Sequence, residues 1–312
     1  MSVKLLGTVL IIVNLLACCS VVAVVFARTH HKETLVIRPF YVPLSNCLEP
    51  DFEASEVIDG RVIHYAVNSD GFRDKNYTVG RPAGKERIIV LGDSYTFGLG
   101  VHSNETFPKI LESRLGHRYE VLNFGVTGYD TEEEVTMLES VGLKYNPDLV
   151  VVAFLTNDVT NHTFLKSKYS ELSGKFSKPL WLRRGTDAST LSLEITDKIW
   201  GAVNGAWDKK MASMTYDEQL GPVKNALEQL EVLATANKFG VIIYIIQDNP
   251  EYTSRLEGIC TGMRWRCLVF DNHGLENGLS LSNYHPSPLM HQMMADQLYH
   301  FMINDTAANN PT

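Results

Sequence analysis

Residues 88–98 read IIVLGDSYTFG, and this stretch decides the fold. Its first four residues are apolar and three of them are β-branched, which is typical of a parallel strand that is covered on both faces. Gly92 lets the chain turn sharply where this strand ends, and ligands bind at that end of the strands in open α/β sheets. Ser94 therefore follows the strand as a candidate nucleophile. A strand that simply ends in a polar turn is the alternative.

Strand and helix patterns alternate through the rest of the chain. Further strands are expected near Val121, near Val150, at 241–246 and at 267–270. Helices are expected at 107–115, 131–141 and 216–237. Such alternation predicts parallel strands joined by right-handed crossovers, so we expect an α/β fold around a parallel sheet of about five strands.

A histidine near the other end of the chain could act as a base for Ser94. His285 lies directly before a helical pattern at 289–302. Pro286 disfavours helical geometry at the residue before it, so the imidazole should be presented from a loop. A turn histidine bonded to the backbone is the alternative. His291 is a weaker candidate, because it falls within the helix.

Two further strands end in residues that can donate hydrogen bonds to an anion. Gly125 follows the strand near Val121, and the pair Asn157 and Asp158 follows the strand near Val150. Glycine permits close approach to the backbone, and asparagine donates without adding charge. Ordinary turn and capping roles are the alternatives.

The order of these residues resembles the four sequence blocks of the SGNH (GDSL) hydrolase superfamily. The blocks are represented by Ser94 in GDSYTFG, Gly125, Asn157 and His285, and the resemblance runs over about 87–302. It implies a three-layer α/β/α, flavodoxin-like fold. It also implies that Ser94 attacks an ester carbonyl while His285 accepts and later returns the proton. The oxyanion hole would combine the backbone N–H groups of Ser94 and Gly125 with the side-chain amide of Asn157.

Two positions depart from the family pattern. The family usually places an aspartate two or three residues before its histidine, but Asn283 and Ser282 occupy these positions here. Asn283 could orient the ring through its side-chain oxygen, as in a Cys-His-Asn site, and Ser282 or a backbone carbonyl could replace it. Leu155 stands where the third block often carries glycine. Asp93 is expected to shape the turn beside the nucleophile and not to relay protons.

The first 30 residues predict a transmembrane signal anchor. Residues 5–27 carry no charge and are long enough to cross about 30 Å of hydrocarbon. A secretory signal cleaved before Arg28 is one alternative, and a lipoprotein box at Cys18 is another. The flanking basic residues are nearly balanced, so they leave the orientation open.

The rest of the chain divides into an arm at 31–84, a catalytic domain at 85–305 and a tail at 306–312. Asp70 and Gly71 form a strong turn signal, so we expect hairpin-like structure in the arm that packs beside the domain.

An insertion in the catalytic domain is expected at about 160–214. It follows the strand that ends in Asn157 and carries Trp181, Trp200 and Trp207. A position over the site would make it a lid or a wall of the acyl pocket. Packing of the aromatic residues onto the core and a glycan-stacking surface are the alternatives.

The family resemblance and the cysteines favour a catalytic domain outside the cytoplasm. Cys260 and Cys267 could close a small disulfide loop, although reduced cysteines are equally compatible with the sequence.

Composition narrows the classes of partner. The net charge is −8 at pH 7, and the sequence shows no basic patch with interleaved aromatic residues, no metal-ligand spacing and no phosphate-binding glycine loop. We therefore expect no nucleic-acid partner, metal or cofactor.

The leading hypothesis for function is a membrane-anchored serine esterase. Its substrate would be a small-molecule or carbohydrate ester, such as an O-acetyl group on a saccharide. One alternative is an O-acyltransferase that modifies an envelope or extracellular polysaccharide. Another is a non-catalytic glycan-binding or scaffold protein on the same fold. A flavodoxin-like binding domain would leave the ordered set of candidate residues poorly explained.

Overall fold

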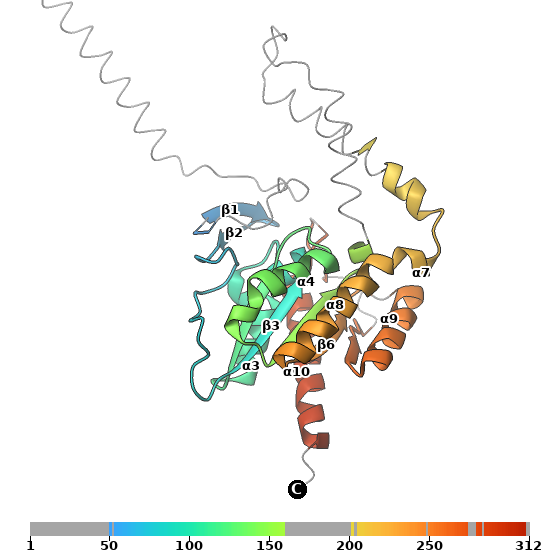
Figure 1. Cartoon of the computed structure of the whole chain (residues 1–312). Helices are drawn as coiled ribbons and strands as arrows, with labels where there is room; N and C mark the ends of the chain where they lie inside the picture. Colours follow the sequence, from blue (N-terminus) through green and yellow to red (C-terminus); the bar gives the residue numbers. More distant parts are fainter. Residues whose placement is uncertain are drawn as a thin grey trace, which may run out of the picture.

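Among the described residues, five parallel strands form the central sheet (Figure 1). They span Glu86–Gly92 (β3), Tyr119–Gly125 (β4), Leu149–Phe154 (β5), Gly240–Ile245 (β6) and Arg266–Val269 (β7). Their order in space is β4-β3-β5-β6-β7, which confirms the expected parallel sheet. The computed structural model describes residues 50–51, 53–159, 201–202, 205–247, 249–273, 279–282 and 284–309.

The strand that leads to Ser94 is buried on both faces. The side chains of residues 88–91 are at most 1% exposed. β3 pairs with β4 on one side and with β5 on the other, and Gly92 lies opposite Gly125. Because parallel strands end at the same edge, the residues that follow β3, β4 and β5 come together there.

Helices cover both faces of the sheet and give the expected three layers (Figure 1). Apolar side chains of α4 (Thr131–Ser140), α8 (Gly221–Asn237) and α9 (Pro250–Met263) share one core with Ile89 and Leu91. Those of α3 (Phe107–Leu115) and α10 (Pro288–Asn309) share a second core with Ile88 and Val90. Successive strand residues point to opposite faces, so this continuous apolar run supplies both cores.

Short helical segments lie between the longer elements. These are α2 (Ser94–Phe97), η1 (Ser103–Glu105), η2 (Gly142–Tyr145), η3 (Thr156–Val159) and α7 (Tyr216–Gln219). The single helix expected over 216–237 is wrong, because the chain forms α7 and then α8. The interruption lies at Leu220, two residues before Pro222 in the first turn of α8. This proline has no N–H to donate to the Glu218 carbonyl four residues earlier, and that carbonyl accepts from Leu220 N instead.

An antiparallel hairpin precedes the sheet. It consists of β1 (Glu53–Ile58) and β2 (Arg61–Ala66). Asp59 and Gly60 form its two-residue turn with φ of 49° and 77°, as a tight hairpin turn requires. The expected turn at Asp70 and Gly71 is present, but the hairpin itself turns earlier in the chain.

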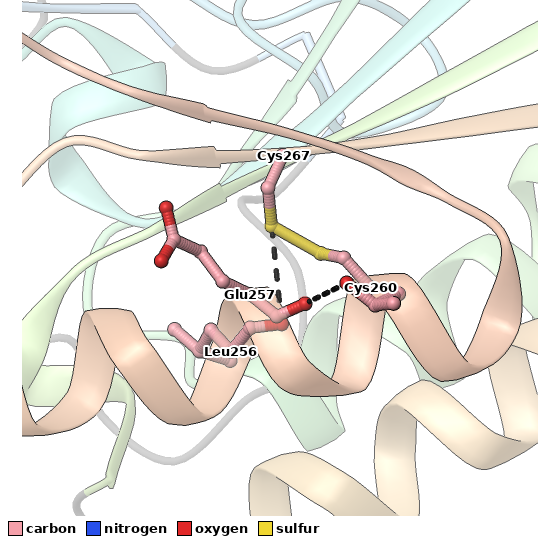
Figure 2. The surroundings of a disulfide bond; sticks show 5 residues. Leu256, Glu257, Cys260 and Cys267 are labelled. Carbon is pink, nitrogen blue, oxygen red and sulfur yellow. Dashed lines mark hydrogen bonds between the residues drawn. A yellow bond between two sulfur atoms is a disulfide. The ribbon is translucent and has the colours of Figure 1, made fainter.

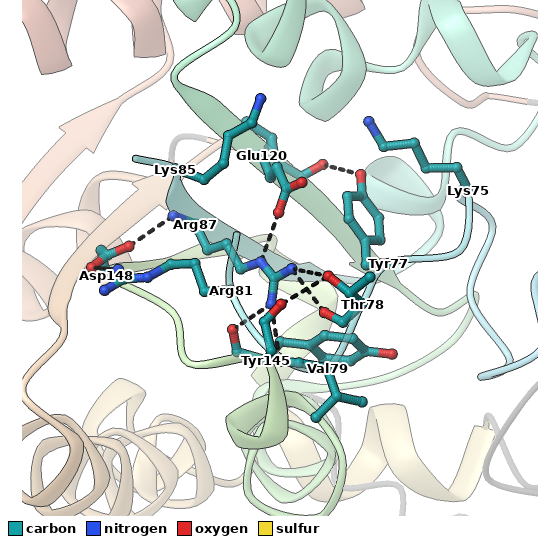
Figure 3. A network of polar contacts seen from close by, with 12 residues as sticks. Lys75, Tyr77, Thr78, Val79, Arg81, Lys85, Arg87, Glu120, Tyr145 and Asp148 are labelled. Carbon is teal, nitrogen blue, oxygen red and sulfur yellow. Dashed lines mark hydrogen bonds and ion pairs between the residues drawn. The ribbon is translucent and has the colours of Figure 1, made fainter. Parts of the chain in front are cut away.

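A buried arginine near the amino end of β3 is the centre of a network of polar contacts (Figure 3). Arg87 is the second residue of β3 and its side chain is fully buried. Its Nε donates to Glu120 Oε2 at 2.8 Å. Its remaining N–H groups donate to the carbonyls of Thr78, Val79 and Tyr145. The arm before β3 is therefore tied to the amino ends of the strands.

A disulfide joins α9 to β7 (Figure 2). The structure pairs Cys260 with Cys267 across a Cα–Cα distance of 6.2 Å. Of the two states that the sequence left open, the structure contains the bonded one.

Several predicted features lie outside the described residues. They include the anchor at 1–30, most of the insertion with Trp181 and Trp200, and Asn283. Trp207 is described and is buried. None of the described helices combines the length and the apolarity that a bilayer crossing requires.

Candidate active site

Ser94 is the first residue of α2 and follows β3 through a tight turn. Asp93 caps this short helix, because its Oδ1 accepts a hydrogen bond from Tyr95 N at 2.9 Å. Gly92 has a φ of +157°, and a Cβ there would lie 2.0 Å from Thr96 Oγ1. The turn therefore requires glycine, and Asp93 shapes it as expected.

His285 reaches Ser94 from a loop before α10. Its Nε2 lies 3.1 Å from Ser94 Oγ, although 191 residues separate the two in the chain. The loop closes on itself, since Leu281 N donates to the His285 carbonyl at 2.8 Å and Ser287 N donates to the Leu279 carbonyl at 2.7 Å. The structure thus brings the predicted nucleophile and base within reach for direct proton transfer.

Asn157 lies at the same edge, in η3 after β5. Its Nδ2 donates to Asp93 Oδ2 at 2.8 Å, and a side-chain amide has a second N–H to offer. Asp93 is buried, and its desolvation raises the pKa of its carboxyl, while the bonds from Asn157 and Tyr95 oppose this rise. Asp93 therefore links the candidate oxyanion donor Asn157 to the turn that carries Ser94.

Gly125 has a different place from the one predicted. It is still part of β4, and its N–H donates to Asn123 Oδ1 at 2.9 Å. A Cβ at Gly125 would lie 2.2 Å from Phe97 N, so glycine is needed for α2 to pack against β4. Asn123 Nδ2 completes this contact by donating to the Thr96 carbonyl at 2.9 Å. The N–H of Gly125, predicted as an oxyanion donor, is thus engaged with a side chain of its own strand.

Gly128 is a second glycine near the site, which sequence reasoning did not single out. It lies in the loop after β4 with a φ of +81°, and a Cβ there would have open space around it. Its N–H donates to none of the described residues. The loop starts beside the nucleophile turn, because Val126 N donates to the Gly92 carbonyl at 2.9 Å. The signal was present as a second glycine three residues after the first.

Two polar side chains beside the dyad were also missed. Tyr95 lies with its ring centroid 6.0 Å from that of His285, and its hydroxyl donates to the Tyr284 carbonyl at 3.4 Å. Gln247 follows β6, donates to the Tyr95 hydroxyl at 3.3 Å and accepts from Thr156 Oγ1 at 2.7 Å. These bonds connect the ends of β3, β5 and β6 with the His285 loop.

The weaker histidine candidate is part of the core. His291 is fully buried in α10, and its Nδ1 accepts a hydrogen bond from Phe107 N at 3.2 Å. Burial lowers the pKa of His291 to about 3, so the ring is neutral at physiological pH.

Two carboxyl groups are buried in the structure around the site. Glu134 on α4 is 1% exposed, and neither of its carboxyl oxygens has a hydrogen-bond partner among the described residues. Asp158 Oδ2 accepts from Leu155 N at 3.0 Å, which fixes the backbone where the family often has glycine. Burial raises the pKa of both carboxyls well above the ordinary values, and the nearby charge of Asp93 adds to both shifts.

Within the described ranges, no group of three or more His, Cys, Asp or Glu side chains is placed to hold a metal ion. The chemical groups that the site does bring together are a hydroxyl, an imidazole, an amide and backbone N–H groups. Such a set can carry out acyl transfer.

Comparison with solved structures gives several similar folds. TesA is 15% identical with a TM-score of 0.46, over 70% of this chain and 98% of that one. The esterase EstA from Pseudoalteromonas sp. is 15% identical with a TM-score of 0.46, over 72% of this chain and 100% of that one. The acetyl xylan esterase AlAXEase is 13% identical with a TM-score of 0.42, over 69% of this chain and 98% of that one.

A comparison with curated proteins gave no match. The model of the GDSL-like Lipase/Acylhydrolase family matches residues 90–293, a span that begins within β3 and ends beyond the His285 loop. The chain therefore belongs to the GDSL-like lipase/acylhydrolase family of the SGNH superfamily and is a serine ester hydrolase.

Proposed function

We propose that the protein hydrolyses a carboxylic ester through an acyl-enzyme on Ser94. The observation that carries this proposal is the 3.1 Å contact between Ser94 Oγ and His285 Nε2. Ser94 Oγ attacks the ester carbonyl while His285 takes its proton, and the ring then returns that proton to the leaving alkoxide. Water next attacks the acyl group with His285 again as base, which releases the acid and restores the serine.

Negative charge on the carbonyl oxygen needs donors at the same edge of the sheet. We assign these to the backbone N–H groups of Ser94 and Gly128 and to the second N–H of the Asn157 amide. Gly128 replaces Gly125 in this assignment, because the N–H of Gly125 is bonded to Asn123. The N–H groups of Ser94 and Gly128 are not used by other described residues.

Asn283 remains our candidate for orienting the His285 ring. It stands two residues before the histidine, where the family usually has an aspartate. An amide oxygen can accept the proton on Nδ1 and so select the useful tautomer. It stabilises the imidazolium less than a carboxylate does.

The substrate that we favour is a short acyl ester on a saccharide. Ser94 is 7% exposed, which suits a small acyl group such as acetyl. Tyr284, directly before the base, is 86% exposed and can offer an aromatic face to a sugar ring.

We further propose that the catalytic domain lies outside the cytoplasm, tethered by the predicted anchor at 1–30. The disulfide between Cys260 and Cys267 supports this location, because such bonds persist in oxidising compartments. Labelling of Ser94 in intact cells with a membrane-impermeant fluorophosphonate tests it. Labelling that occurs only after the cells are opened would refute the location.

The function is tested with p-nitrophenyl esters of graded acyl length and with an acetylated oligosaccharide. Ser94→Ala should lower kcat by more than about a thousandfold and abolish labelling by a fluorophosphonate probe. Ser103→Ala, at an exposed serine in η1, is the matched control and should keep both. Hydrolysis by Ser94→Ala at the wild-type rate would refute the proposal. Product analysis with a free sugar present separates hydrolysis from acyl transfer, since a transferase would form a new sugar ester.

A further inference from the structure

The tip of the amino-terminal hairpin contacts the loop that carries His285. Ser282 N donates to Asp59 Oδ2 at 3.1 Å, across 223 residues of sequence. The Ser282 hydroxyl also bonds to this carboxyl, and these two bonds lower the pKa of Asp59. The group is therefore a carboxylate at neutral pH.

Ser282 lies in the loop where its position affects that of His285. It stands three residues before His285, at one of the two positions where the family usually has an aspartate. The turn around it is closed by the bond from Leu281 N to the His285 carbonyl and by the bond from Tyr284 N to the Leu281 carbonyl at 2.9 Å. A contact that fixes Ser282 therefore also restricts the backbone of His285.

The hairpin that carries Asp59 is itself firmly attached beside the nucleophile. Arg61 Nη2 contacts both carboxylate oxygens of Glu105, at 2.6 and 2.7 Å. Tyr65 OH accepts a hydrogen bond from Gly100 N at 2.9 Å. Ile63 and Tyr65 also pack against Phe97, the last residue of α2.

A buried arginine strengthens the same attachment. Arg73 is 1% exposed and donates to the carbonyls of Phe97 at 3.1 Å and Val101 at 2.7 Å. Its guanidinium lies 4.4 Å from the centroid of the Tyr65 ring. The segment that follows Ser94 and the hairpin are thus held together on the side of the nucleophile.

We propose that the β1–β2 hairpin is a built part of the active site and that Asp59 is a positioning residue, which holds the His285 loop against Ser94. The hairpin contacts the elements that carry both Ser94 and His285. Its strands pack against α2, and Asp59 in its turn accepts a hydrogen bond from the histidine loop. A distant segment thereby supplies a carboxylate to a loop that lacks the family's own aspartate. This inference rests on the proposed Ser94–His285 chemistry.

Two variants of Asp59 test the contact without disturbing the turn. Asp59 has a positive φ of 49° and precedes Gly60, and both asparagine and glycine are well accepted at that position. Asp59→Asn keeps an oxygen that can accept from Ser282, whereas Asp59→Gly removes the acceptor. Val62→Thr, at a half-exposed position of the same hairpin, is the control for general effects on β2.

In the full chain, Asp59→Gly should lower kcat for an acetyl ester roughly tenfold while KM stays within about twofold, because the base is misplaced and the binding surface is unchanged. Asp59→Asn should recover most of the loss, and Val62→Thr should match wild type. Hydrogen exchange at the Ser282 amide should be faster in Asp59→Gly than in wild type. This second measurement does not depend on activity.

The outcomes separate this inference from the proposed function. If wild type and Asp59→Gly hydrolyse the ester at equal rates, the positioning role is refuted while the esterase assignment stands. If wild type hydrolyses no ester and Ser94 is not labelled, the proposed function fails. Should Asp59→Gly fold poorly, Ser282→Ala gives a second reading, since it removes the hydroxyl donor and leaves the hairpin intact. Because the Ser282 N–H still donates to Asp59 in that variant, kcat should fall by a smaller factor than in Asp59→Gly. A kcat equal to that of wild type would overturn the proposal.

Discussion

At the scale of single residues, the glycine that ends β4 and the glycine in the loop after it have different roles. Gly125 is required for packing against α2, whereas Gly128 has a φ of +81° and an N–H that donates to none of the described residues. The sequence shows both glycines but not where β4 ends. Because β4 pairs with β3 as far as Gly92 and Gly125, the first glycine stays inside the sheet and the second enters the loop.

Substitution of Gly128 tests its role as an oxyanion donor. Gly128→Ala should lower kcat roughly tenfold to a hundredfold, because a side chain at positive φ shifts the N–H that contacts the substrate. Gly116→Ala is a matched control, since Gly116 has a φ of +77° and open space but lies at the end of α3. Both variants should lose similar stability in thermal unfolding, and only Gly128→Ala should lose activity. Equal kcat values for the two would contradict the assignment.

A second residue-scale prediction concerns the position before the base. Asn283→Asp should raise kcat for a chromogenic acetyl ester roughly tenfold, because a carboxylate stabilises the imidazolium that forms on His285. The same change in a Ser94→Ala background should have no effect. An unchanged or lower rate would show that Asn283 does not orient the ring.

At the scale of elements, the sheet was predictable from the sequence because three of its strands, β3, β5 and β6, contain continuous runs of apolar, mostly β-branched residues. The position of the hairpin was harder to predict. The arm contains two Asp-Gly pairs, at 59–60 and at 70–71, and both adopt turns. The second pair does not end a hairpin, because a neighbouring side chain bonds to the backbone around it. Asn68 Oδ1 accepts from Asp70 N and Phe72 N and so holds the second pair in a compact turn.

The link between α9 and β7 is an element-scale feature with a measurable effect. Cys260 and Cys267 are seven positions apart, and closing so short a loop should stabilise the fold by about 2.5 kcal/mol through the unfolded state. The double variant Cys260→Ala, Cys267→Ala should lose this amount in urea unfolding and keep its kcat. Wild type measured in reductant serves as the control and should approach the variant. Equal stability of oxidised and reduced wild type would contradict the expectation.

At the scale of the whole molecule, buried acids should make stability depend on pH. Glu134 keeps its proton in the folded state at pH values where an unfolded carboxyl is ionised, because its folded pKa is raised. The stability that protonated Glu134 gives the folded state is therefore fully present below the ordinary carboxyl pKa of about 4.3. It is lost as pH rises towards the pKa of Glu134 in the folded state.

Glu134→Gln should remove this dependence. The variant should exceed wild type in free energy of unfolding by about 1–3 kcal/mol at neutral pH, and the difference should shrink as pH falls to about 4. Urea unfolding across this pH range measures it. Glu132→Gln, at an exposed position of the same helix, is the control. A difference that does not vary with pH would contradict the explanation.

The parts of the site that the sequence could predict are those fixed by local order along the chain. Ser94, Asn157 and His285 follow recognisable strands or precede a helix, and the structure brings them to one edge of the sheet. The contact of Asp59 with Ser282 could not be predicted, because it depends on how two distant loops pack.

The hydrogen bonds from Arg73 to carbonyls at and after the end of α2 limit which segments can be exchanged between related proteins. A recombination breakpoint placed at residue 84, between the arm and the domain, would separate this guanidinium from the backbone that satisfies it. Chimeras joined there should express poorly, whereas those joined before Glu53 carry hairpin and sheet together. The hairpin arm and the catalytic domain should therefore be exchanged together in such recombinants.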